Sequence, residues 1–208
     1  MTQRLLHIDA SPRGERSVSR RLTGEFVAAW KASHPDGEMT YRDLGREPVP
    51  HVNEAWIAGA FTPPDQHTPE SKTAIEISDR LIDEFVAADC YVLGAPMYNF
   101  NVPSTLKAYI DQIVRVGRTF TVDGDGNYQG LVSGKKLLVV TSRGGNYRPG
   151  SPAQPYDMQE PFLRLIFGFI GITDVSFIHA DSLQFGDEAR DQSLAEARAK
   201  IAEVAPSW

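Results

Sequence analysis

YVLGAPMYNFNVPSTLKAYIDQIVR, residues 91–115, is the segment that decides the fold of this chain. Its apolar start, residues 91–95, has the length and composition of a buried strand and stops at Pro96. After Pro103, a residue favoured at the first position of a helix, apolar residues recur at helical spacing. The segment therefore predicts a strand, an exposed loop and a helix. In an open parallel sheet such a loop lies at the carboxyl edge, where ligands bind.

The same alternation of strands and helices continues along the rest of the chain. We expect further strands at residues 5–9, 39–44, 136–142 and 174–179. We expect further helices at residues 17–31, 54–59, 70–88, 162–169 and 187–204, and a hairpin turn at residues 123–126. This pattern predicts a single α/β domain, residues 1–208, with a doubly wound five-stranded parallel sheet and helices on both faces.

The loop after the first predicted strand is rich in hydroxyl groups. It contains Ser11, Ser17 and Ser19 and leads directly into a helix, without the G-x-G-x-x-G or G-x-x-x-x-G-K-[ST] signatures. Unpaired helix amides and serine hydroxyls bind a phosphate, and basic side chains attract it. The alternative is that Ser17 only caps the helix and the basic residues lie on a solvated face. The basic residues are Arg13, Arg16, Arg20 and Arg21.

Two further loops follow core strands at the same predicted edge. Residues 97–100 offer two aromatic faces, a thioether and an amide, which suit a planar heteroatom-rich ring. Gly144 and Gly145 can present bare amides to a ligand, for instance to the carbonyl edge of a flavin, although a simple chain reversal also explains them. With the first loop, these features match a mononucleotide that carries a redox ring.

Composition narrows the class of protein. The chain has 208 residues, a net charge of −6 and a pI near 5.4, so we expect neither a nucleic-acid nor an anionic-membrane partner. No apolar run approaches the ~20 residues that a membrane span needs. Cys90 is the only cysteine, which indicates a cytoplasmic protein without an internal disulfide. The five histidines show no metal-ligand spacing, so no metal is expected.

At this point a family resemblance becomes visible. APMYNFNVPSTLKAYID, followed by TF, GLVSGKK, TSRGG and FGFIGITDV, resembles the FMN-dependent NADH-azoreductases, which are flavodoxin-like NAD(P)H:quinone oxidoreductases. The similarity runs in order over nearly the whole chain. It implies bound FMN, NADH or NADPH as electron donor, a quinone or azo substrate, and a homodimer with active sites at the subunit interface.

The resemblance also implies where FMN binds and how it works. Its phosphate would lie on the first loop, and its ring against the loops after the third and fourth strands. FMN would carry the chemistry in a ping-pong hydride mechanism, without a catalytic residue of the protein. The implied cofactor-binding residues are Ser11, Ser17, Val18, Ser19, Met97, Tyr98, Asn99, Phe100, Ser142, Arg143, Gly144 and Gly145.

Substrate preference is less determined. Phe120, Phe162 and Phe167 are candidates for the wall of the acceptor pocket, with ordinary core positions as the alternative. Val122 stands where several relatives have a tyrosine, and the first loop is more basic than usual. Two other functions stay open: a flavin reductase acting on chromate or a nitroaromatic, and a flavodoxin-type electron carrier. A flavin-binding sensor is a third.

Overall fold

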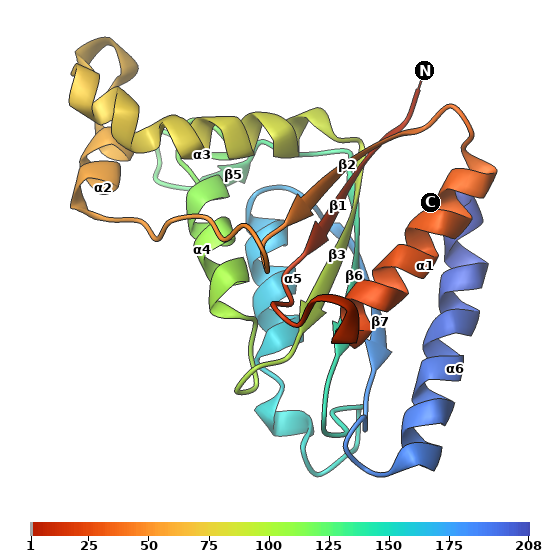
Figure 1. The fold of residues 1–208 in the computed structure, drawn as a ribbon. Coiled ribbons are helices and arrows are strands. Elements are labelled where there is room, and N and C mark those ends of the chain that lie inside the picture. The colour runs from red at the N-terminus through yellow and green to blue at the C-terminus, as the bar shows by residue number, and fades with distance from the viewer. Residues whose placement is uncertain (1) are drawn as a thin grey trace.

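A computed structural model describes residues 2–208 of the chain (Figure 1). Its centre is a sheet of five strands in the order β2-β1-β3-β6-β7, with every neighbouring pair parallel. This order confirms the predicted sheet and is the flavodoxin-like winding. The strands are β1 (Arg4–Asp9), β2 (Glu38–Asp43), β3 (Cys90–Pro96), β6 (Lys136–Ser142) and β7 (Asp174–Ala180).

Helices cover both faces of the sheet, as Figure 1 shows. On one face, α1 (Val18–Ser33) and α6 (Asp187–Val204) pack on a core that includes Phe26, Trp30 and Leu138. On the other face, α3 (Pro69–Ala87), α4 (Ser104–Ile113) and α5 (Gln159–Phe169) pack on a second core. Each predicted helix is present, with ends shifted by a few residues.

Strand β3 shows why the central segment can be read from sequence. All seven of its residues are buried, as expected for a strand with helices on both sides. Cys90 at its start is a free thiol, and burial raises its pKa to about 12. Gly94 allows close packing, because a Cβ there would lie 2.3 Å from the buried carboxylate oxygen Oδ1 of Asp9. The buried thiol behaves as an inert apolar group at neutral pH.

The remaining elements lie outside the central layers. Helix α2 (Glu54–Phe61) and the outer part of α3 form an arm that projects from the sheet (Figure 1). The predicted hairpin is confirmed as β4 (Phe120–Val122) and β5 (Tyr128–Gly130), in which Asp123 accepts from the amides of Asp125 and Asn127. Short 3-10 helices are η1 (Gly14–Arg16), η2 (Pro64–Gln66), η3 (Gln154–Tyr156) and η4 (Ala205–Ser207). Within residues 2–208, no helix has both the length and the apolar character of a membrane span.

Candidate functional site

A cleft of about 380 Å³ opens at the carboxyl edge of the sheet, beside the ends of β1, β3, β6 and β7. This volume falls in the range of small-molecule sites, roughly 300–1,000 Å³. None of its lining residues is acidic, in a chain of net charge −6. The lining residues are Ser11, Arg13, Arg16, Ser17, Val18, Pro96, Met97, Tyr98, Ser142, Arg143, Gly144, Leu183, Gln184 and Arg190.

The first loop builds a buried cradle of hydroxyls at the start of α1. Ser17 caps the helix, its Oγ accepting from the amide of Arg20 at 3.3 Å and lying 3.2 Å from Ser19 Oγ. Ser11, Ser17 and Ser19 are 1%, 2% and 0% exposed. The amides of Val18 and Ser19, at the helix start, have no intrahelical acceptor. Hydroxyls, free amides and the positive end of the helix dipole together suit a phosphate.

Arg20 supports this cradle from behind and does not line the cleft. Its guanidinium donates to the carbonyl of Ser11 at 2.7 Å and to both oxygens of Asp43, at 2.7 and 2.6 Å. The hydrogen bond with Asp43 raises the pKa of Arg20 above its ordinary value. Arg21 is exposed and also lies outside the lining set. The basic character expected for this loop is therefore carried into the cleft by Arg13 and Arg16 alone.

The loop after β3 is a tight turn held in a strained conformation. Tyr98 and Asn101 exchange backbone hydrogen bonds of 2.9 and 3.1 Å, and Asn99 and Phe100 between them have φ of 48° and 68°. Positive φ at both central positions is a type I′ turn, which disfavours a bulky residue such as phenylalanine. The turn keeps Tyr98 and Phe100 at the surface, 37% and 48% exposed. Strain that holds aromatic rings in solvent is typical of functional sites.

The loops after β6 and β7 are joined through their backbones. The carbonyls of Gly144 and Gly145 accept from the amides of Gln184 and Ser182, at 3.2 and 2.8 Å. The amides of the two glycines donate no hydrogen bond to any residue from 2 to 208. Ser182 holds φ of 58°, a left-handed conformation that the paired loops maintain. Gly144 in the cleft wall and the adjacent Gly145 therefore present two free donors on a fixed backbone, which suits negative charge on a ring carbonyl.

Arg143, one of the lining residues, takes part in a buried ionic network. Its Nε and Nη2 donate to the two carboxylate oxygens of Asp181 at 2.5 and 2.9 Å, and its Nη1 donates to Asp157 at 2.7 Å. Arg143 and Asp181 are 2% and 0% exposed. Asp181 also accepts from the amide of Tyr147 at 3.3 Å. The side chain of Arg143 therefore ties the β6 loop to the β7 loop at the edge of the cleft.

Eight of the twelve predicted cofactor-binding residues line this cleft. Ser19, Asn99, Phe100 and Gly145 are adjacent to it in the same loops but do not line it. The three candidate acceptor residues lie elsewhere. Phe167 is 1% exposed and stacks on Phe85 in the core, Phe162 packs against that core, and Phe120 contacts Phe169 beside the hairpin. The structure thus places all three in packed apolar surroundings.

Sequence reasoning missed one wall of the cleft. Leu183 and Gln184 follow β7, and Arg190 comes from the first turn of α6. The position of residues 181–184 directly after the last predicted strand was a usable signal, because parallel strands all end at one edge. Arg190 carried no local signal, since its placement depends on how α6 packs beside α1.

Near the carboxyl end of β6, a hydrogen-bonded chain connects β6, β7 and α5. Thr141 Oγ1 lies 2.8 Å from His179 Nδ1, and His179 Nε2 lies 2.9 Å from Glu160 Oε2. Arg164 donates to the other oxygen of Glu160 at 2.7 Å. The hydrogen bond from His179 is the largest cause that lowers the pKa of Glu160, to about 2, with burial opposing it.

Replacing Glu160 by glutamine is expected to remove part of the protein's acid sensitivity. A carboxyl whose pKa falls from 4.5 to about 2 on folding stabilises the fold above pH 4.5, and this contribution is lost as the pH falls towards 2. We expect Glu160→Gln to lower the unfolding free energy by about 2 kcal/mol at pH 7 and by much less at pH 3. Urea unfolding at both pH values measures this. A loss equal at both pH values, or equal to that of Glu203→Gln at an exposed ion pair, would contradict it.

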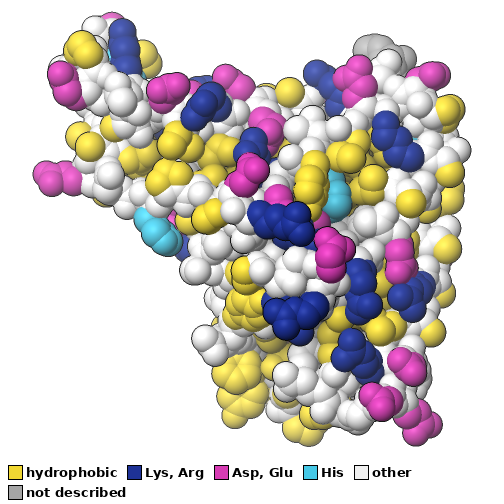
Figure 2. Space-filling view, in the orientation of Figure 1, with side chains coloured by type: hydrophobic (Ala, Val, Ile, Leu, Met, Phe, Trp, Pro, Cys, Tyr) yellow, Lys and Arg dark blue, Asp and Glu magenta, His cyan; other side chains and the backbone are white. Residues whose placement is uncertain are grey.

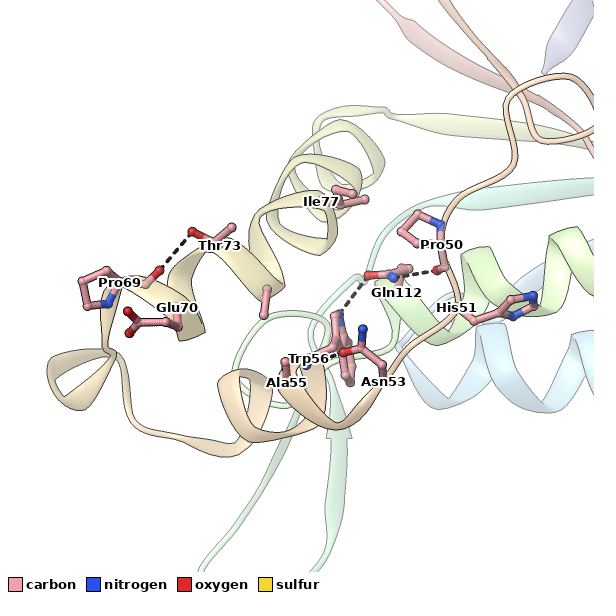
Figure 3. Close-up of a pocket in the computed structure, with 11 residues that line it drawn as sticks. Pro50, His51, Asn53, Ala55, Trp56, Pro69, Glu70, Thr73, Ile77 and Gln112 are labelled. Atoms are coloured by element: carbon pink, nitrogen blue, oxygen red, sulfur yellow. Dashed lines mark hydrogen bonds between the residues drawn. The ribbon is translucent and has the colours of Figure 1, made fainter.

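A somewhat larger hollow, about 460 Å³, lies between α2 and α3 (Figure 3). Some of its polar groups are already paired with one another. Trp56 Nε1 donates to Gln112 Oε1, and Gln112 Nε2 donates to the carbonyl of Pro50, both at 2.9 Å. Figure 3 shows both bonds, so the donors of Trp56 and Gln112 are satisfied, unlike the free amides beside the cleft. The cleft at the sheet edge is therefore the better candidate site.

The residues of the cleft fit a phosphate-bearing group with a planar ring. Free amides and buried hydroxyls lie at the start of α1, and the exposed aromatic rings of the β3 loop and the free glycine amides of the β6 loop lie in or beside the same cleft. In the described part of the chain, no group of three or more His, Cys, Asp or Glu residues could hold a metal ion. The arrangement can bind and orient an organic cofactor; it offers no base paired with a nucleophile.

Comparison with known proteins gives concordant results. A family model described as "Flavodoxin-like fold" matches residues 3–205. The FMN-dependent NADH:quinone oxidoreductase 2 of Trichormus variabilis is 63% identical over 205 residues, covering 98% of this chain and 99% of the relative. The corresponding enzyme of Azotobacter vinelandii is 50% identical over 202 residues, covering 97% and 99%.

Solved structures are similar over the full length. A crystal structure of an azoreductase from Bacillus anthracis superposes with a TM-score of 0.91 at 28% identity, covering 100% of both chains. A FMN-dependent NADH-azoreductase from Bacillus anthracis, in complex with FMN, has a TM-score of 0.88 at 25% identity and covers 98% of both chains.

Proposed function

The chain belongs to the family of FMN-dependent NADH:quinone oxidoreductases of flavodoxin-like fold, and we propose that it passes two electrons from NADH or NADPH to quinones and reductively cleaves azo compounds in ping-pong order. It is an FMN-dependent oxidoreductase. The observation that supports this role best is the convergence of three loop ends on one cleft. When bound, FMN supplies the redox chemistry by accepting a hydride and passing electrons on.

The protein's residues act by binding and orientation. Ser11, Ser17 and Ser19 would hold the phosphate through their hydroxyls, together with the free amides at the start of α1. The turn that carries Tyr98 and Phe100 would position the ring. Because the backbone hydrogen bonds between Tyr98 and Asn101 already hold this turn in shape, the turn needs little reorganisation when a ring binds.

The glycine amides have an electrostatic role. Gly144 and Gly145 each offer an unpaired backbone amide. Their carbonyls accept hydrogen bonds from the loop after β7, which fixes this stretch of backbone. Such preorganised donors stabilise negative charge that develops on a ring carbonyl. Arg143 behind them keeps this backbone in place through Asp181. The site thus favours the reduced, more negative state of a bound ring without a protonatable side chain at that point.

We also propose that the enzyme is a cytoplasmic homodimer with both chains at each acceptor site. Exposed apolar side chains beside the cleft support this. The rings of Phe100 and Tyr156 lie 5.5 Å apart, and Met158, 53% exposed, donates its amide to the carbonyl of Phe100. A surface of this kind fits either a planar acceptor or a second copy of the chain. The buried free thiol of Cys90 agrees with a reducing compartment.

The phosphate assignment is tested by replacing both Ser17 and Ser19 with alanine. Loss of two hydroxyls that donate to a charged group is expected to weaken FMN binding about 100-fold. Quenching of FMN fluorescence by the apoprotein measures this affinity. Thr68→Ala removes the equivalent cap of α3 at a site remote from the cleft, and controls for helix destabilisation. Equal FMN affinities for the double variant and the native protein would remove the assignment.

The ping-pong order has a kinetic test. With donor and quinone both varied, initial rates in double-reciprocal plots are expected to give parallel lines, because one substrate leaves before the other binds. Intersecting lines would contradict the proposed order.

A further inference from the structure

Most arginines of this chain pair with a carboxylate, but three that line the cleft do not. Ten of the 15 arginines form an ion pair with an Asp or Glu. In residues 2–208, Arg13, Arg16 and Arg190 have no acidic partner, and all three line the cleft. We call these three residues the arginine rim. In Figure 2, Lys and Arg side chains gather around the start of α1, in the orientation of Figure 1.

Burial separates the arginine rim from the phosphate cradle. The cradle hydroxyls of Ser11, Ser17 and Ser19 are at most 2% exposed. By contrast, Arg13 and Arg16 are exposed and Arg190 is half-buried. The cleft therefore has an inner level of buried neutral donors and an outer level of more exposed cationic side chains.

The charges of the rim exceed what one phosphate monoester needs. Such a group carries about −2 at neutral pH, and the inner level already offers hydroxyls, amides and a helix dipole. Neighbouring acids do not neutralise the rim: Glu15 turns to Arg46 at 3.4 Å, and neither Asp187 nor Glu188 lines the cleft. Guanidinium groups without a carboxylate partner attract a second anion.

We propose that the arginine rim is a second anion subsite, which binds phosphate groups of the nicotinamide dinucleotide donor. The inference rests on the proposed function, because it concerns the donor of that reaction. A dinucleotide that places its nicotinamide near the glycine amides extends its phosphates out of the cleft. The fork geometry of arginine binds phosphate oxygens in pairs, and the exposed rim can do so while the inner cradle is filled.

Donors with and without phosphate distinguish this role. FMN-loaded Arg13→Gln/Arg16→Gln and Arg190→Gln enzymes are compared using NADH, NADPH and 1-benzyl-1,4-dihydronicotinamide, which lacks phosphate. For the double variant we expect the KM for NADH to rise about 10-fold, with kcat unchanged, and the KM for the benzyl donor to stay the same. Calorimetric titration of the oxidised holoenzyme with ADP is expected to show a similar loss of affinity. Arg80→Gln, an unpaired arginine on α3 outside the cleft, is the matched control.

The two dinucleotides identify which phosphate is bound. If the substitutions raise the KM for NADH and for NADPH equally, the rim binds the pyrophosphate that both donors share. If they raise the KM for NADPH more, the rim also binds its 2′-phosphate. Unchanged KM values and ADP affinity, an equal loss with the benzyl donor, or weakened FMN retention alone would overturn the inference. Native holoenzyme that oxidises neither dinucleotide would instead contradict the proposed function, so the two failures are distinguishable.

Discussion

Replacing Arg143 by glutamine is expected to lower the unfolding free energy by about 3–5 kcal/mol, because it leaves the buried carboxylate of Asp181 and the partly buried carboxylate of Asp157 without their cation. Asp181 is 0% exposed and takes two hydrogen bonds from this guanidinium, and Asp157 takes a third. For a chain of this size, such a loss lowers Tm by about 10 °C. Thermal unfolding followed by circular dichroism measures it.

The same substitution is expected to affect the cofactor. The amides of Gly144 and Gly145 are held by the loops that Arg143 joins, so FMN affinity is expected to fall at least about 10-fold. Arg143→Lys keeps the charge and loses the paired hydrogen-bond geometry. Its Tm and FMN affinity should therefore lie between those of the native protein and those of Arg143→Gln. Arg148→Gln removes an exposed ion pair with Glu196 and serves as the control. A Tm within 2 °C of the native value for Arg143→Gln would contradict the network's structural role.

Replacing Gly45 by alanine is expected to disturb the phosphate cradle from the opposite side. A Cβ at Gly45 would lie 2.1 Å from the carbonyl oxygen of Ser11 and 2.9 Å from Arg20 Nη2. Backbone atoms cannot move aside as a flexible side chain can, so we expect a loss of about 3 kcal/mol in unfolding free energy. Displacement of Ser11 should also weaken FMN binding at least about 10-fold. Urea unfolding and fluorescence titration report the two effects separately.

Gly24 provides the matched control for that experiment. It lies within α1, and a Cβ there would meet nothing within 4 Å. Gly24→Ala is therefore expected to stabilise the fold by about 0.5–1 kcal/mol, with FMN binding unchanged. If Gly45→Ala behaved like Gly24→Ala, the close approach between the β2 and β1 loops would have no role in forming the cradle.

The elements that sequence predicts well are those whose signal is local. The seven buried residues of β3, the cap at Ser17 and the turn at residues 123–126 each depend on neighbours in the chain. The sheet order then follows from the resemblance and from the regularity of parallel strands. These features are present in the structure with small shifts at helix ends, where fraying makes boundaries uncertain from any pattern.

Side-chain directions in the site could not be obtained in the same way. The guanidinium of Arg143 pairs with Asp181, 38 residues further along, and no local pattern shows that partner. The positive φ of Phe100 breaks the usual preference of a bulky residue, so propensity points away from it. Arg190 reaches the cleft only because α6 packs beside α1. Long-range packing therefore determines the partner of Arg143, the backbone conformation of Phe100 and the position of Arg190. Such departures from local preference are expected at functional sites.

The most direct test of the account is the flavin content of the purified protein. We expect the protein to bind FMN in a 1:1 ratio with a Kd of about 1 μM or tighter, to bind riboflavin at least about 100-fold more weakly, and to lose its visible flavin absorbance when NADH is added without oxygen. Riboflavin lacks only the phosphate, so this ratio reports the cradle at Ser11, Ser17 and Ser19. Protein that stays colourless with FMN at tens of micromolar, or that binds both flavins equally, would contradict the account.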